Sequence, residues 1–305
     1  MLVIACPGQG SQTPGFFTPW LELPAFAEVI EIASSASGLD LTTFGTISDA
    51  DTIKDTAIAQ PLIVSASLAS FAALGSAGLG EVAGVAGHSV GEVAAASIAG
   101  VFDTAEAMAF VTKRGNEMAK AAGLESSSMA AVLGGERDEV VAELTKRGLF
   151  AANYNSAGQI VAAGDADGIA ALAANAPAGT RVIPLAVAGA FHTRFMEPAV
   201  AELDNYANGI SVTDPGITLW TNRDGSAVSS GPKYLELLVS QVSNPVRWDL
   251  CMESMVSAGV TALIELSPAG TLAGIAKRAM PGVETLALKT PDQLDAAIEL
   301  AKNHA

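Results

Sequence analysis

The chain has 305 residues, half of them apolar, and its 32 acidic and 16 basic side chains give a formal net charge of −16. This composition allows a large core without disulfides, and it offers no basic surface of the kind that nucleic-acid binding requires. The N-terminal apolar run ends at Pro7, which makes it too short for a membrane span, and the lone thiols Cys6 and Cys251 suit a reducing compartment. We therefore expect a soluble cytoplasmic protein without nucleic-acid or membrane partners.

Strand-like and helix-like segments alternate in the first part of the chain, which is typical of a parallel sheet with crossover helices. The predicted elements are strands over residues 2–6 and 82–86 and helices over residues 25–37, 59–76 and 104–122. Asp103 is a good N-cap for the last of these helices, and Gly123 is expected to end it. Similar strand and helix signals resume in the last third of the chain.

A different pattern occupies the middle of the chain. Its segments are SMAAVLGG, ERDEVVAELTKRG, LFAANYNSAGQIVAAG, DADGIAALAANAPAG and TRVIPLAV, which predict a strand, a helix, a hairpin, a helix and a strand. This β-α-β-β-α-β order is that of a ferredoxin-like unit. We therefore predict an α/β fold with an α/β-hydrolase-like large subdomain (residues 1–126 and 193–305), which has a parallel sheet and a nucleophile elbow, and an inserted ferredoxin-like small subdomain (residues 127–192).

The pentapeptide GHSVG, residues 87–91, fits the G-x-S-x-G pattern of a nucleophile elbow, and it lies between an apolar strand and a helix. In such a turn small residues avoid clashes, the Ser89 hydroxyl projects out of the sheet, and the Val90 N–H becomes an oxyanion donor. The alternative is an ordinary tight turn in which Ser89 caps the helix. We favour the elbow.

A nucleophilic serine needs a base, and the chain has three histidines. His88 adjoins the serine and should leave the turn in another direction, while His304 lies in a polar tail that we expect to be disordered. His192, in a glycine-containing loop, is therefore the candidate base. No acidic residue nearby is an obvious third member, although Glu197 follows five residues later. A backbone carbonyl or an amide can orient the imidazole instead, so we favour a Ser-His dyad.

Arg114 is predicted to lie on the apolar face of its helix, together with Ala107, Phe110, Val111 and Met118. A guanidinium among core residues must find an anion. One interpretation is an internal salt bridge to Glu117 or Glu92. The other is a clamp for a substrate carboxylate, which arginine binds through two parallel hydrogen bonds.

Several motifs together resemble the malonyl-CoA:acyl carrier protein transacylases and the related acyltransferase domains of fatty acid and polyketide synthases. They occur in the family's order over nearly the whole chain: PGQGSQ, AQP, GHSVGE, KRGNEM, AANYNSAGQIVAAG, GAFHTRFMEPA, TNRDG, QVSNPVRW and ELSPAGTL. The resemblance implies that Ser89 is acylated, that His192 is the base, and that Arg114 holds the malonyl carboxylate. It also implies that Gln241 supports the imidazole in place of a triad acid.

The resemblance assigns further residues to the pocket. Gln9 would complete the oxyanion hole beside the Val90 N–H, and Asn155 would line the pocket. Phe191 resembles the malonyl-selective type, in which a bulky ring disfavours an α-methyl group. Val90 stands where many relatives carry leucine, and Ser267 stands where glycine is frequent; neither change touches a catalytic assignment.

The expected reaction is malonyl transfer from malonyl-CoA to phosphopantetheinylated acyl carrier protein, with no metal or redox cofactor. The alternatives are a serine esterase or thioesterase with water as acceptor, or an inactive module that only binds a carrier protein. Because carrier proteins are acidic, docking on this acidic chain requires a local basic patch. Arg194, Lys277 and Arg278 are candidates for it, or else ordinary solvated charges.

Overall fold

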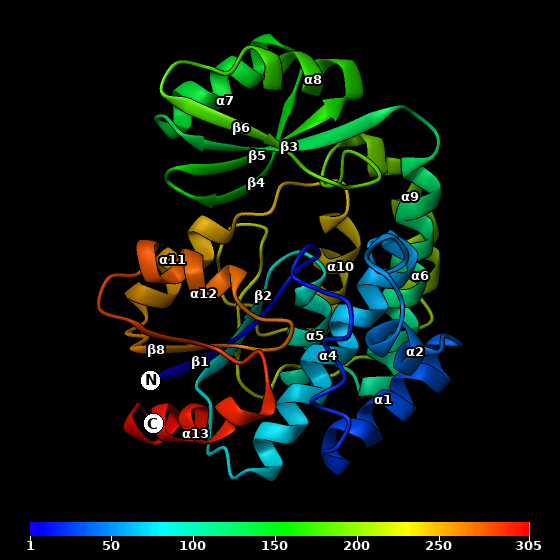
Figure 1. Ribbon diagram of the computed structural model, residues 1–305, viewed down its shortest axis with the longest axis vertical. Helices are drawn as coiled ribbons and strands as arrows, with labels where there is room; N and C mark the ends of the chain where they lie inside the picture. Colours follow the sequence, from blue (N-terminus) through cyan, green and yellow to red (C-terminus); the bar gives the residue numbers. More distant parts are fainter. Residues whose placement is uncertain (305) are drawn as a thin grey trace.

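The computed structural model describes residues 1–304 and contains two separate sheets (Figure 1). The larger sheet is parallel throughout, in the order β7-β2-β1-β8-β9. Its strands are β1 (Leu2–Cys6), β2 (Gly84–Gly87), β7 (Thr218–Leu219), β8 (Ala262–Glu265) and β9 (Glu284–Ala287). The central strands are buried on both faces, which explains why they are short continuous apolar runs in the sequence.

Helices cover both faces of this sheet, and further helices pack against these. They are α1 (Pro24–Ser37), α2 (Leu41–Thr46), α3 (Ala50–Ile53), α4 (Thr56–Ser76), α5 (Gly91–Ile98), α6 (Thr104–Ala122), α9 (Glu197–Ala207), α10 (Gly231–Gln241), α11 (Trp248–Ser257), α12 (Thr271–Ala279) and α13 (Leu294–Asn303). Side chains alternate along β1, so Leu2 and Ile4 join the core with α1, α4 and α6, whereas Val3 and Ala5 join the core with α11 and α12.

Helix α4 is long and apolar enough to cross a membrane by length and composition alone. However, 78% of its apolar window is buried inside the protein, where it packs against α1, α5 and α6. We therefore interpret it as a core helix; the sequence predicted a helix over residues 59–76.

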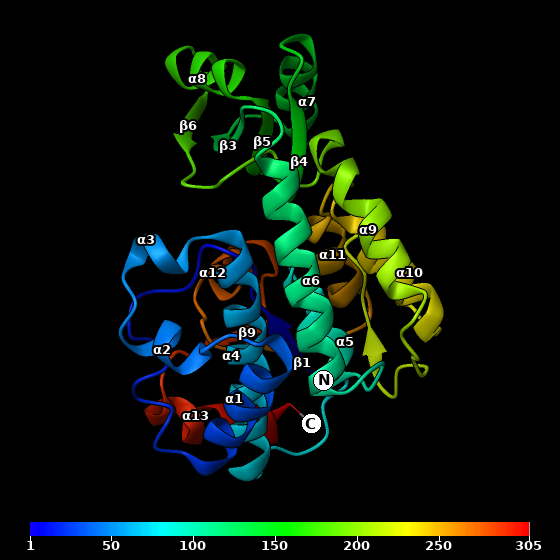
Figure 2. The same ribbon diagram turned by 90° about the vertical axis from the view of Figure 1, so that its right-hand side faces the viewer.

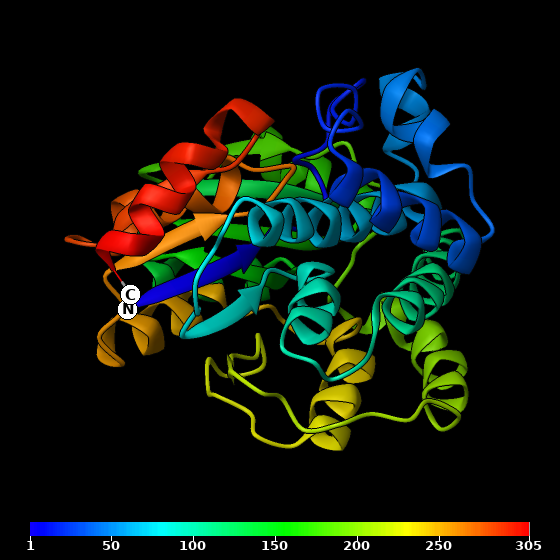
Figure 3. The same cartoon turned by 90° about the horizontal axis from the view of Figure 1, so that it is seen from below.

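The two chain ends meet near the start of the central strands β1 and β8 of the large sheet (Figure 3). The Met1 ammonium donates to Thr261 Oγ1 at 2.9 Å, and His304 Nδ1 lies 2.9 Å from the same oxygen. His304 Nε2 also lies 3.2 Å from a carboxylate oxygen of Glu284. The prediction of a disordered tail around His304 is therefore wrong, because α13 packs its apolar face against the core and holds this histidine in place.

The smaller sheet is antiparallel, in the order β4-β5-β3-β6. It consists of β3 (Ser127–Gly134), β4 (Phe150–Ser156), β5 (Gln159–Asp165) and β6 (Thr180–Pro184), with α7 (Arg137–Lys146) and α8 (Ala166–Ala174). This is the strand order of the ferredoxin-like unit. The two helices cover the outer face, so the inner face is turned toward the large sheet (Figures 1 and 2).

Alternation along β3 separates two environments. Ala130 and Val132 pack under α7 and α8, whereas Met129 and Ala131 line a cavity between the two sheets. The fold class is thus the predicted one, an α/β protein with a parallel sheet and a second, antiparallel sheet. The division into a large subdomain (1–126 and 193–305) and a small one (127–192) stays a proposal.

Candidate active site

Strand β2 leads into a sharp turn at Ser89, and α5 begins two residues later. Ser89 has φ +53°, in the left-handed region that non-glycine residues rarely occupy. A Cβ atom at Gly87 would collide with the backbone of Gly91, and one at Gly91 would collide with the carbonyl oxygen of Cys6. The two glycines are therefore required for the chain to turn this tightly beside β1.

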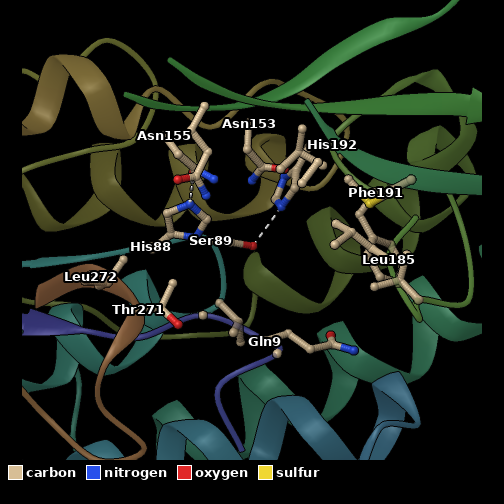
Figure 4. A pocket seen from close by; sticks show the side chains of 18 of the residues that line it. Gln9, His88, Ser89, Asn153, Asn155, Leu185, Phe191, His192, Thr271 and Leu272 are labelled. Carbon is tan, nitrogen blue, oxygen red and sulfur yellow. Dashed lines mark hydrogen bonds between the residues drawn. The ribbon is translucent and has the colours of Figure 1, made fainter. Parts of the chain in front are cut away.

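His192 lies across from this turn, with its Nε2 2.7 Å from Ser89 Oγ (Figure 4). Its Nδ1 is 2.9 Å from the carbonyl oxygen of Gln241, which can only accept, so Nδ1 carries the proton and Nε2 is free to receive one. His192 also has a positive φ, +62°, and its N–H donates to the Val242 carbonyl. Glu197 is exposed at the start of α9.

Burial, together with the positive charge of Arg114, lowers the pKa of His192 to about 3. The imidazole is 4% exposed, so it is neutral throughout the physiological range and ready to accept the Ser89 proton. This arrangement can activate the serine as a nucleophile without a carboxylate partner for the base.

Two residues beside Ser89 each have a backbone N–H group without a partner among the described residues. Within residues 1–304 the N–H groups of Val90 and Gln9 donate to no acceptor, and both residues line the cavity in front of Ser89. The Gln9 side chain extends away from the serine, and its amide donates to the Lys54 carbonyl at 3.3 Å (Figure 4). The chemistry available here is therefore that of backbone N–H groups, as in an oxyanion hole.

The cavity has a volume of about 270 Å³ and lies between the two sheets. Its walls come from the first glycine loop, the elbow, the inner face of the small sheet, the loop before His192 and the start of α12. Phe191 lines it and is 7% exposed, and Asn155 lines it from β4. All predicted site residues except Arg114 and Gln241 line this cavity.

The neighbouring His88 faces away from the serine, as the sequence predicted. Its Nε2 is 2.8 Å from Asn155 Oδ1, and its ring lies edge-on to Trp248 with centroids 5.8 Å apart. Burial lowers the pKa of His88, which favours the neutral ring. Asn155 therefore links the elbow to the small sheet in addition to lining the cavity.

Sequence reasoning missed a buried polar network behind the elbow. The Ser89 N–H donates to Asn222 Oδ1 at 2.7 Å, and Asn222 Nδ2 donates to the Gly87 carbonyl at 2.8 Å. Glu92, 1% exposed, accepts a hydrogen bond from the Asn222 N–H at 2.6 Å. Both residues stood inside matched motifs, but nothing in the sequence indicated that they meet.

Gln241 connects this network to the base and to the buried arginine. Its side-chain amide nitrogen donates to the Glu92 carboxylate and to the Ser89 carbonyl, while its main-chain carbonyl orients His192. Its Oε1 accepts from Arg114 Nη2 at 2.7 Å. Gln241 thus contacts the imidazole through its main chain.

Arg114 lies on the buried face of α6, as predicted, and is 1% exposed. Its Nη1 donates to Gln60 Oε1 at 2.6 Å, and its Nε has no partner within residues 1–304. Glu117 is paired instead with Lys113 and Lys120. Burial lowers the pKa of Arg114 to about 10, opposed by the charge of Glu92. The guanidinium is held by neutral amides, which leaves its charge available to an anion.

Glu92 should make stability depend on pH. Burial raises the pKa of Glu92 from 4.5 to about 7, so the folded state holds this proton more tightly than the unfolded state does. The protonated Glu92 therefore contributes to the free energy of unfolding at low pH. This contribution, up to roughly 3 kcal/mol, is lost as pH rises from 4.5 to about 7. We expect the free energy of unfolding of Glu92→Gln, measured in denaturant from about pH 5 to about pH 8, to fall less than that of the parent.

The variant itself loses stability, because an amide at this position places a donor against the Gln241 amide, whose oxygen is engaged by Arg114. The informative quantity is therefore the slope with pH and not the absolute value. If the free energies of unfolding of parent and variant changed in parallel with pH, Glu92 would not titrate between about pH 5 and about pH 8 in the folded state.

Comparisons with known proteins agree on one family. The family model described as "Acyl transferase domain" matches residues 3–292. The curated malonyl CoA-acyl carrier protein transacylase of Mycobacterium bovis is 48% identical over 297 residues, which cover 97% of this chain and 98% of the relative. A crystal structure of MCAT from Mycobacterium tuberculosis has TM-score 0.94 and 48% identity, covering 99% of both chains. A malonyl-transacylase solved in complex with its type II PKS acyl-carrier protein has TM-score 0.93 and 28% identity, covering 98% of this chain and 99% of that one.

Proposed function

This chain belongs to the family of acyl transferase domains, and on that premise we propose that it moves a malonyl group from malonyl-CoA to the phosphopantetheine thiol of acyl carrier protein. It is an S-malonyltransferase that serves fatty acid or polyketide synthesis. The assignment of its catalytic residues rests on one observation above all, the 2.7 Å contact between Ser89 Oγ and His192 Nε2 beside a buried arginine.

In the first half-reaction, His192 Nε2 takes the Ser89 proton while Oγ attacks the thioester carbon of malonyl-CoA. The negative charge that develops on the carbonyl oxygen is stabilised by the N–H groups of Val90 and Gln9. The Gln241 carbonyl keeps the imidazole in the tautomer that can accept this proton, and it stabilises the imidazolium that forms. The imidazolium then protonates the departing CoA thiolate, which leaves a malonyl ester on Ser89.

In the second half-reaction the carrier thiol enters and gives its proton to His192. The thiolate attacks the ester, and the Ser89 oxygen leaves with the proton returned by the imidazolium. Arg114 holds the malonyl carboxylate throughout, which keeps the acyl group in one orientation and disfavours attack by water. Phe191 disfavours an α-methyl group on the substrate.

The test of this function uses labelled malonyl-CoA with and without phosphopantetheinylated carrier protein. We expect a stoichiometric malonyl ester on the chain without carrier, and transfer of the label to the carrier when it is added. Rapid release of free malonate in both arms would favour the hydrolase alternative. Free buried thiols at Cys6 and Cys251 support a cytoplasmic, reducing location, which we also propose.

We expect the docking of carrier protein to depend more on Arg278 than on the preceding residue, Lys277. On α12, Arg278 follows Thr271 and Ile275 at offsets of one helix face, and those two residues line the active-site cavity. Lys277 lies on another face, beside Glu284 and Glu299. Arg278→Glu should therefore raise the KM for carrier protein severalfold and leave the malonyl-CoA half-reaction unchanged, as steady-state kinetics can measure.

Lys277→Glu is the matched control, since it changes the same charge one residue away. Arg194, whose guanidinium lies 4.4 Å from the centroid of the Phe195 ring, is a separate basic candidate for carrier docking. Equal effects of the two reversals on carrier KM, or a carrier affinity that rises with salt, would contradict a local patch around Arg278.

A further inference from the structure

Each Nη atom of Arg114 donates to an amide oxygen, Nη1 to that of Gln60 at 2.6 Å and Nη2 to that of Gln241 at 2.7 Å. A guanidinium only donates hydrogen bonds, so each amide must turn its oxygen toward Arg114 and its nitrogen away. A guanidinium has five N–H donors, so two amides leave others unused, among them Nε. Arg114 does not line the active-site cavity, however, so a carboxylate that pairs with the same Nη groups must displace at least one of the two amides.

The two amides are not held equally. The nitrogen of Gln241 donates to the Glu92 carboxylate and to the Ser89 carbonyl, and its main chain orients His192. Among residues 1–304 the nitrogen of Gln60 donates only to Met118 Sδ, at 3.4 Å, and a thioether is a weak acceptor. Displacing Gln60 therefore disturbs fewer strong hydrogen bonds than displacing Gln241.

The positions of the two glutamines also favour displacement of Gln60. Gln60 and Met118 line the active-site cavity, whereas Gln241 borders a separate small cavity beside Glu92. Helices α4 and α6 approach closely here, since a Cβ atom at Gly115 would lie 3.0 Å from the Thr56 carbonyl oxygen. Gln60, which binds Arg114 Nη1, is therefore the amide of the two that faces the active-site cavity.

We propose that Gln60 is a specificity-determining residue that covers Arg114 in the free enzyme and turns aside for a substrate carboxylate. Its oxygen leaves Arg114 Nη1, and its amide N–H, relieved of the sulfur, then donates to the carboxylate together with the guanidinium. A neutral acyl group brings no acceptor of this strength and leaves Gln60 in place. The inference rests on the proposed function and explains how one pocket distinguishes malonyl from acetyl thioesters.

The test is Gln60→Glu, which would put a fixed carboxylate on Arg114 in competition with the substrate. We expect the ratio of kcat/KM for malonyl-CoA to that for acetyl-CoA to fall by roughly 10² or more, because an acetyl group brings no carboxylate to compete with the new one. Gln293→Glu is the matched control, because Gln293 accepts hydrogen bonds from the Lys289 and Thr290 N–H groups through an oxygen that glutamate retains. Its ratio should equal that of the parent.

A second measurement needs no variant. In crystal structures of the parent acylated on Ser89, the 2.6 Å contact between Gln60 Oε1 and Arg114 Nη1 should be lost with malonyl and kept with acetyl. The same contact in both structures, or an unchanged ratio in Gln60→Glu, would overturn the inference while leaving malonyl transfer established. Absence of malonyl transfer by the parent would overturn the proposed function and this inference with it.

Discussion

Ser89→Ala is expected to carry no malonyl ester after incubation with malonyl-CoA, and its transfer rate should fall by roughly 10⁶. The reason is chemical: Ser89 Oγ is the hydroxyl 2.7 Å from the neutral, buried His192, and alanine offers no atom to acylate. Intact-mass measurement of the chain, with and without malonyl-CoA, detects the ester directly.

The fold of this variant should persist. Alanine keeps the Cβ atom that serine already carries at φ +53°, and the hydrogen bond of residue 89 to Asn222 comes from its backbone N–H. Its thermal midpoint should therefore lie close to that of the parent. A malonyl adduct on the folded variant would show that another residue is the nucleophile.

Much of the fold could be predicted because its signals are local. Helix α6 begins and ends where Asp103 and Gly123 indicated, since Asp103 forms a capping box with Glu106. The ferredoxin-like order followed from the alternation of short strands and amphipathic helices. The C-terminal helix was missed although only three of its ten residues are charged and its buried residues Ala297, Ile298 and Ala301 repeat at helical spacing.

In the candidate site, too, the residues with local signals could be predicted and those that depend on long-range contacts could not. Ser89 lies in a five-residue motif whose glycines are required by the tight turn, and His192 was identified by elimination among three histidines. By contrast, the contact between Glu92 and Asn222 joins residues 130 positions apart. The sequence could also not distinguish the carbonyl of Gln241, which orients the imidazole, from its side-chain amide, which binds Arg114 and Glu92.

Arg114→Ala should impair malonyl-CoA use by about 2–5 kcal/mol in kcat/KM while sparing acetyl-CoA. The substrate carboxylate would lose its buried charge partner, whereas an acetyl group never used it. The variant should also raise the pKa of His192, because the charge of Arg114 lowers it in the parent. Parallel kinetics with the two thioesters, together with the pH dependence of acylation, measure both effects.

Arg114→Lys is the control that separates charge from geometry. Lysine keeps a positive charge but lacks the two parallel Nη donors that now hold Gln60 and Gln241 at 2.6 and 2.7 Å, so its malonyl activity should fall between those of parent and alanine variant. Equal losses on malonyl-CoA and acetyl-CoA in the alanine variant would mean that the guanidinium only supports the fold. A loss confined to malonyl-CoA would mean that its role is to bind the carboxylate, since in the proposed mechanism both substrates use the same serine, base and oxyanion donors.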